Sequence, residues 1–412
     1  MPRARREGTR LRIAIAVGAL VGAMALPPAR AQLICGDCDG NLSVDIIDAL
    51  KGARFDAGLT TLSPSEFDAC NVVQPMVADV SILDALAIAR YVVGLLPTLG
   101  CLPSGPPAAT KLYVNVGNAV EIVDLATNAS VGTIPISGVG QGIDIGAAGA
   151  FVYATASGNL YEIDTGTDII SRTLPLNRTT ARKVAVVGSS AYVAHFVTSP
   201  GSTVDRVDLL STLVSTLAIG VSAWEITASQ SGTQLYTAHI GSGDRVTRIS
   251  TASFTVGGST PLSNNPIAIE EDPITGDLYV AARDASPDIS GLSDLHVLDA
   301  TSLASVGSFA IDDAFGLAVL PDGSALYTAS NHQTGAPAPP YFARKVDLIT
   351  ATVLPVMIPI GDQPWYFTVD VAGRNVYTCD NASNQISRID TVTDTVIATI
   401  PLTAAPRDAV TR

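Results

Sequence analysis

An acidic stretch near the amino terminus carries oxygen-bearing side chains at alternating positions, a pattern suited to binding a metal ion. The candidate ligands are Asp37, Asp39, Asn41, Ser43 and Asp48. Hard Ca²⁺ takes about six to eight oxygen ligands, and this spacing with a final carboxylate matches a calcium loop, although Leu42 stands where such loops have Gly. Asp48 would close the site from the first turn of a helix, where an acid also suits the helix dipole. The pattern predicts bound calcium; an acidic turn that only caps a helix is the alternative.

The helix that must position Asp48 occurs twice. Residues 46–59 (IIDALKGARFDAGL) and 82–95 (ILDALAIARYVVGL) align at an offset of 36, with eight of fourteen positions identical. Both copies place apolar residues at helical spacing. In the loop before the second copy, Val73, Pro75 and Val77 replace the first three candidate ligands. The duplication therefore predicts a small all-α domain over residues 33–101 with one intact calcium loop.

Four cysteines fall within this small domain, at Cys35, Cys38, Cys70 and Cys101. Four cysteines in a small exported domain indicate two disulfides with three possible connectivities. A bridge between Cys35 and Cys101 would tie the two ends of the domain together. A metal site is the alternative, but no histidine lies nearby. Cys379 stands far downstream and is expected to be a small buried residue.

Residues about 35–97 resemble a dockerin, on the strength of the calcium-loop spacing and the repeated "LDAL.IARY..GL" helix. A dockerin is a duplicated, EF-hand-type loop-helix module. The resemblance implies calcium binding and reversible attachment to a cohesin-like partner, as in assemblies that degrade polysaccharides. It therefore also suggests a carbohydrate ligand for the rest of the chain.

Residues 1–31 have the layout of a secretory signal peptide. Five arginines precede the apolar run from Ile13 to Leu26, and Ala29-Arg30-Ala31 fits a cleavage site. A membrane anchor is the alternative, but the run is too short to cross about 30 Å of hydrocarbon. No later stretch is apolar enough to span a membrane. We expect a secreted protein, located outside the cell, at the cell surface or in the periplasm.

The composition excludes several classes of function. The chain has 412 residues, a formal net charge of −14 and only 24 basic residues. Nucleic acid is not expected as a partner, because phosphates require a basic face. Aromatic residues make up 5%, while Gly (35) and Pro (25) are plentiful, which favours short strands and tight turns over helices.

After a Pro-rich linker at residues 102–110, the chain repeats. A strand-like segment with a tyrosine recurs at Tyr113, Tyr153, Tyr192, Tyr236, Tyr279, Tyr327 and Tyr377. Four short strands in each repeat of about 40–50 residues indicate a blade of a β-propeller. Prolines recur in the last strand of five repeats, as an exposed blade edge permits, at Pro135, Pro175, Pro261, Pro359 and Pro401.

The fold class predicted for residues 111–412 is mainly all-β, a seven-bladed propeller with four-stranded blades. Residues 406–412 match the first strand of a blade, so they are expected to complete the blade that begins at 111 and close the ring. The phrase "LYVA...IDTxTxxxxxTIP" resembles the YVTN-type β-propeller family of exported prokaryotic proteins. Relatives in that family include lactone-hydrolysing and quinoprotein-like enzymes as well as binding scaffolds. The propeller is expected to be monomeric.

Ligands of propellers usually bind at the mouth of the central channel, near the start of each innermost strand. The residues predicted there are Gln141, Arg182, Trp224, Pro266, Phe315, Trp365 and Arg407. These side chains could stack on a sugar or hold an acidic group; the alternative is that they plug the channel. Asp144, Glu225 and Asp408 lie nearby in the sequence and could form acid–base pairs.

The leading functional hypothesis is a secreted, calcium-binding scaffold or recognition protein. Its dockerin-like module would attach it to a partner, and its propeller would bind a ligand or protein. The alternatives are an extracellular hydrolase or lyase acting on carbohydrate and a lactonase- or quinoprotein-like enzyme. No G-x-S-x-G, HExxH or P-loop motif occurs, so the sequence identifies no catalytic residue. Paired acids across the channel would favour an enzyme, and Trp and Arg without paired acids would favour binding.

Overall fold

The computed structural model describes residues 109–412 except 198–200, 221, 242, 263–264, 284–293, 312–313 and 331–340, together with residues 38, 44, 46–56, 88–89 and 92. The chain forms two compact units, Met1–Gly105 and Pro106–Arg412. Among the described residues, no helix has the length and apolar character needed to cross a bilayer.

The amino-terminal unit contains helix α1 (Ile46–Asp56), which begins where the sequence predicts the first copy of the repeated helix. Asp48 in its first turn and Arg54 in its last turn complement the helix dipole. Asp48 is fully buried, and Cys38 is disulfide-bonded. The loop of the second copy lies outside the described residues. So do the other predicted calcium ligands and the other cysteines of this domain: Asp37, Asp39, Asn41, Ser43, Cys35, Cys70 and Cys101.

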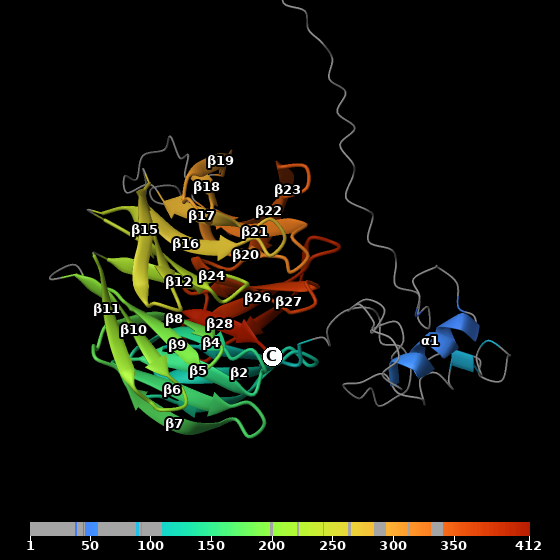
Figure 1. The fold of residues 1–412 in the computed structure, drawn as a ribbon, viewed down its shortest axis with the longest axis horizontal. Helices are drawn as coiled ribbons and strands as arrows, with labels where there is room; N and C mark the ends of the chain where they lie inside the picture. Colours follow the sequence, from blue (N-terminus) through green and yellow to red (C-terminus); the bar gives the residue numbers. More distant parts are fainter. Residues whose placement is uncertain are drawn as a thin grey trace, which may run out of the picture. The chain divides into compact units, whose positions relative to one another are not determined.

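The second unit is a propeller of seven four-stranded antiparallel sheets (Figure 1). Its innermost strands are β4 (Gly140–Ile145), β8 (Ala181–Val187), β12 (Ala223–Ala228), β16 (Asn265–Glu271), β20 (Ala314–Val319), β24 (Pro364–Val369) and β28 (Asp408–Thr411). Each contacts the innermost strands of the two neighbouring blades, so the seven strands surround one channel. The predicted seven-bladed fold is confirmed.

The other three strands of each blade follow outward in the order of the chain, and in the blade that the C-terminus completes the innermost strand comes last in the chain. The second strands are β5 (Phe151–Ala156), β9 (Ser190–His195), β13 (Gln234–His239), β17 (Asp277–Arg283), β21 (Ala325–Ser330), β25 (Asn375–Asp380) and β1 (Lys111–Asn115). The third strands are β6 (Asn159–Asp164), β10 (Ser202–Asp208), β14 (Arg245–Ser250), β18 (Asp294–Asp299), β22 (Tyr341–Asp347), β26 (Gln385–Asp390) and β2 (Ala119–Asp124). The outermost strands are β7 (Ile169–Pro175), β11 (Val214–Gly220), β15 (Thr255–Pro261), β19 (Ser305–Ala310), β23 (Thr352–Ile360), β27 (Thr395–Pro401) and β3 (Ala129–Pro135).

The five recurring prolines lie in outermost strands, as predicted. Pro135, Pro175, Pro261 and Pro401 are the last residues of their strands, and Pro359 is next to last in β23. Proline has no N–H to offer to another strand, so these edges resist pairing with a second molecule.

An aspartate in a turn of one blade contacts side chains of the neighbouring blade. In the β6–β7 turn, the Asp164 carboxylate accepts the backbone N–H of Thr167 at 2.8 Å, and the chain then passes through Asp168 at φ 57°. The carboxylate of Asp168 accepts the hydroxyl of Tyr113 and the ammonium of Lys111 from the preceding blade, both at 2.6 Å. The recurring tyrosine therefore packs between blades and also fixes their separation.

The same arrangement recurs five blades later in the chain. There Asp394, at φ 52°, accepts the hydroxyl of Tyr327 at 2.5 Å and the ammonium of Lys345 at 2.9 Å. Both tyrosines are fully buried. A polar tip on a buried aromatic side chain needs a partner, and the turn aspartate supplies it.

The C-terminal strand closes the ring. Strand β28 pairs with β1, with Leu112 opposite Thr411 and Tyr113 opposite Val410. The Arg412 carbonyl also accepts the N–H of Thr110 at 2.7 Å. In Figure 1 the red C-terminal end lies beside the cyan start of the propeller. The first and last segments of the propeller thus share one blade.

Deletion of residues 406–412 is expected to lower the melting temperature and broaden the unfolding transition. The deletion removes the innermost strand of one blade and exposes the facing edges of its neighbours. Differential scanning calorimetry of the full-length and truncated proteins measures the effect. An unchanged melting temperature would contradict closure by this strand.

Candidate ligand site in the central channel

The innermost strands bring charged side chains into the channel in two layers. Counted from the recurring tyrosine, Lys183, Glu225 and Asp408 occupy the same position, because each faces the residue two places after a tyrosine. Asp144 and Glu270 occupy the position directly opposite the tyrosine. Residues two apart in a strand lie on the same face, so both layers point into the channel.

Asp408 connects three blades through one carboxylate. Its Oδ2 accepts the ammonium of Lys183 at 2.6 Å and the backbone N–H of Ile143 at 2.8 Å. Its Oδ1 accepts the N–H of Ala409 at 3.0 Å. Asp408 is 1% exposed, so its charge is balanced inside the protein by Lys183 and by these backbone dipoles.

Asp144 has a similar structural role one blade further on. Its Oδ2 accepts the N–H of Val186 in β8 at 2.7 Å, and its Oδ1 accepts the N–H of Ile145 at 2.8 Å. The innermost strands are edges whose N–H groups face the channel and need acceptors. Asp144 and Asp408 supply acceptors that cross from one blade to the next.

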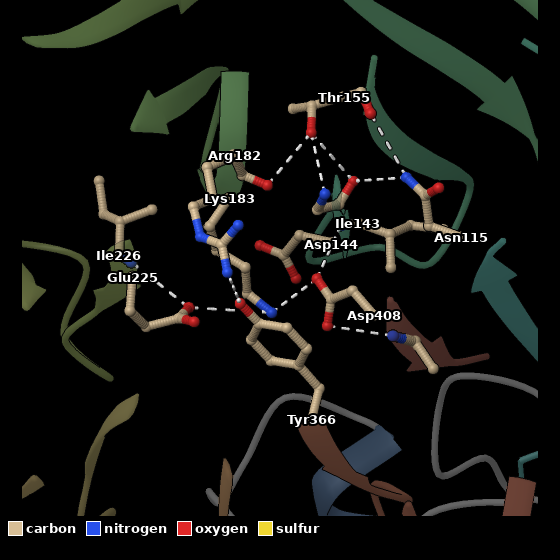
Figure 2. A network of polar contacts seen from close by, with 12 residues as sticks. Asn115, Ile143, Asp144, Thr155, Arg182, Lys183, Glu225, Ile226, Tyr366 and Asp408 are labelled. Carbon is tan, nitrogen blue, oxygen red and sulfur yellow. Dashed lines mark hydrogen bonds and ion pairs between the residues drawn. The ribbon is translucent and has the colours of Figure 1, made fainter. Parts of the chain in front are cut away.

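Glu225 is held differently. Its Oε1 lies 3.8 Å from the Lys183 ammonium and accepts the N–H of Ile226 at 3.3 Å. Its Oε2 is buried and has no hydrogen-bond partner. Figure 2 shows the carboxyl groups of Asp144, Glu225 and Asp408 gathered around the end of Lys183. Because the Lys183 ammonium contacts both Glu225 and Asp408, the carboxyl groups of these two residues lie close together.

Burial and mutual repulsion keep protons on this cluster. Burial raises the pKa of Glu225 to about 8, and the Asp408 and Glu270 charges add to the shift while Lys183 opposes it. Burial likewise raises the pKa of Glu270 to about 7 and of Asp144 to about 6. Burial disfavours a charged Lys183, but the carboxylates of Asp408 and Glu225 outweigh it and raise its pKa.

These groups line a cavity of about 260 Å³ within the channel. Its charged lining consists of Asp144, Lys183, Glu225, Glu270 and Asp408, and its apolar lining includes Ile143, Val184, Ile226, Phe367 and Val410. These residues come from six of the seven innermost strands. The cavity therefore lies on the axis of the propeller rather than between two blades.

None of the residues predicted at the channel mouth lines this cavity, and four of them contact one another. The Arg182 guanidinium lies 3.1 Å from the centre of the Trp224 ring, and its nitrogens also reach Gln141 and Tyr366 at 3.4 Å. Arg407 reaches the same Gln141 oxygen at 3.4 Å. Arg182 thus joins three neighbouring side chains at the strand starts, on one side of the acidic layers.

The remaining predicted mouth residues belong to the core. Phe315 is 5% exposed and packs edge-on against Trp365, with ring centres 5.9 Å apart. Pro266 lies at the start of β16. The same register shift follows Pro266 in β16 and Ala223 in β12, so Ile267 corresponds to Trp224 in the strand register. Such a bulge gives one strand an extra residue.

Two residues of the cluster were not predicted, Lys183 and Glu270. Lys183 is one of only four lysines in the chain, and it lies in a strand whose other members are mostly apolar. A charged side chain inside an otherwise apolar innermost strand is the signal that could have identified both.

No protein-family model and no curated protein sequence matches the chain. Among solved structures, it is similar to a protein of unknown function from Desulfotomaculum acetoxidans (TM-score 0.60, 13% identity, 73% of this chain and 98% of that chain). A candidate 6-phosphogluconolactonase from Bacteroides uniformis is also similar (0.58, 14%, 74% and 100%). So is hydrazine synthase from Kuenenia stuttgartiensis (0.57, 16%, 65% and 88%). At these identities the likeness shows the fold alone, a β-propeller.

The raised pKa of Glu225 makes a prediction about stability. A carboxyl that holds its proton more tightly in the folded than in the unfolded protein stabilises the fold at low pH and loses that contribution as pH rises through the folded pKa. We expect the free energy of unfolding to fall by on the order of 2 kcal/mol between about pH 6 and about pH 8 through Glu225, with no further loss above the folded pKa, and E225Q removes this loss. Urea denaturation across this range measures it. D322N, in an exposed turn, is the control; equal slopes in E225Q and the unmodified protein would contradict the assignment.

Proposed function

We propose that this chain is an exported recognition protein whose propeller binds a small ligand in the central channel. The observation that carries the proposal is the cavity of about 260 Å³ on the propeller axis, with five charged side chains in its lining. Concave sites on which a few polar or charged groups converge are typical of small-molecule sites. The signal-peptide pattern of residues 1–31 supports export.

The binding role is favoured over catalysis because two of the four acids that line the cavity already have structural partners. Asp408 and Asp144 accept backbone N–H groups of two neighbouring blades. Protonating either would weaken the contacts between those blades. Glu225 and Glu270 have no such cross-blade partner among the described contacts, and one oxygen of Glu225 is unpartnered.

Hydrolysis of a lactone is the second candidate function. Glu225 has a pKa of about 8, which is near the range of a general acid or base at neutral pH. Asp408 lies close by through their shared contact with Lys183. The similarity in fold to a candidate 6-phosphogluconolactonase is consistent with such a reaction. A carbohydrate remains a further candidate ligand, although a sugar could stack on Trp224 only if Arg182 left its ring.

A larger side chain at Thr227 should block the channel. Thr227 lines the cavity from β12, so T227F fills it and is expected to abolish changes in tryptophan fluorescence caused by a ligand. Trp224 lies in the same strand and would report on occupancy. The panel contains oligosaccharides, lactones and quinones, and hydrolysis of each lactone is followed in parallel.

The matched control is T399F on the exposed face of the outermost strand β27, which should respond like the unmodified protein. If T227F binds every ligand as well as T399F does, the channel is not the site. Turnover of a lactone that T227F loses would establish the enzyme instead of the binding protein.

We also propose that residues 33–101 form a calcium-binding module that attaches the chain to a protein partner. Helix α1 supports this, because Asp48 lies buried in its first turn, where the closing ligand of the loop should be. Ile46, Ile47 and Leu50 of α1 are each more than half exposed and offer an apolar face to a partner. A cohesin-like protein is the partner that the dockerin resemblance suggests.

The calcium proposal predicts that D48A loses the stabilisation that calcium gives to this module. Loss of a bidentate carboxylate leaves the ion with too few oxygen ligands. Thermal unfolding with excess calcium and with a chelator measures the difference. D56A, at the other end of α1, should keep the calcium response, and an equal response in D48A would show that Asp48 is no ligand.

A further inference from the structure

The channel cavity has more acidic than basic groups. Its lining contains four carboxyl groups and one ammonium group, that of Lys183. Arg182 is close by but is outside the lining, stacked on Trp224. Lys183 is engaged at 2.6 Å by Asp408 and can fully balance only one charge. The cavity is therefore a place where a further positive charge is favoured.

Glu225 identifies where that charge would bind. Its side chain is 6% exposed, lines the cavity and leaves Oε2 without a donor. A buried carboxyl oxygen without a partner is costly, and the cost is removed when a ligand donates a hydrogen bond to it. Glu270 lines the same cavity from β16 and adds a second carboxyl group that no backbone N–H in the described structure occupies.

The arrangement suits an ammonium group better than a metal ion. In the part of the chain that the structure describes, no three His, Cys, Asp or Glu side chains converge as metal ligands would. An ammonium group has three N–H donors, so it can bind carboxylates that are spread around a cavity. Ile226 and Phe367 also line the cavity, but both are buried in the hydrophobic core, so the carboxyl groups provide the recognition.

We propose that the ligand of this channel is a small organic molecule that carries a protonated aliphatic amine. This inference rests on the function proposed above, that the channel binds a small ligand. The amine donates to Glu225 Oε2 and lies between Glu225 and Glu270.

Binding is coupled to loss of protons from the site. The groups that face Glu225 are Lys183, Asp408, Glu270 and Arg182, and those that face Glu270 are Lys183, Asp144 and Asp408. With pKa values of about 8 and about 7, both glutamates hold protons near neutral pH. A bound ammonium lowers both pKa values, so protons leave as it binds and affinity rises with pH up to about 8.

Isothermal titration with putrescine as the probe tests this inference, with butanediol as the uncharged molecule of the same shape. We expect saturable binding of putrescine, no binding of butanediol, and a heat that varies with the ionisation enthalpy of the buffer because protons are released. E225Q should weaken binding at least about tenfold, since it replaces a charged acceptor with a neutral one. D322N, which removes an exposed carboxylate, should bind like the unmodified protein.

The inference is overturned if putrescine does not bind, if butanediol binds equally well, or if E225Q binds putrescine with unchanged affinity. It is also overturned if calcium or manganese binds in this channel in a Glu225-dependent manner and excludes putrescine. The proposed function is judged separately by T227F. If an uncharged ligand binds and T227F abolishes its binding, the channel site stands and only the amine is wrong.

Discussion

The free edges of the seven innermost strands impose the constraint on which the propeller depends. Each blade ends at the channel with a strand whose channel-facing N–H groups have no further strand to pair with. A backbone N–H without an acceptor is costly, so acceptors from the protein stabilise these edges. Asp408 and Asp144 meet that need by accepting N–H groups of the next blade at 2.8 and 2.7 Å. Lys183 then balances the charge that Asp408 brings into the channel.

This solution concentrates charge on the axis and leaves one part of it unbalanced. Asp408 is fully engaged, whereas Glu225 shares Lys183 at 3.8 Å and keeps one oxygen without a partner. Burial therefore raises the pKa of Glu225, because a neutral carboxyl group is easier to bury than a carboxylate. Because these carboxyl groups keep their protons when no positive charge balances them, a cationic ligand can bind there in place of the protons. The structural requirement of closing the channel and the capacity to bind a ligand thus arise from the same residues.

The sequence predicted the blades well because the signals are local and repeated. The tyrosines, the turn aspartates and the edge prolines recur at fixed places, and the final strand matches the missing part of the first blade. The channel was harder to predict because its charged residues differ from blade to blade. Glu225 and Asp408 could be noted one by one, but their common contact with Lys183 depends on distances across three blades. That information is absent from any single repeat.

The central claim is that Glu225 is a buried carboxyl group that remains protonated near neutral pH. The most direct measurement is a carbon-13 NMR titration of the glutamate side-chain carboxyl groups, with E225Q used to assign the resonance of Glu225. We expect this resonance to titrate with an apparent pKa near 8, the value that burial in the channel implies. A pKa near 4.5, the ordinary value for glutamate, would show instead that Glu225 is ionised and balanced in the channel.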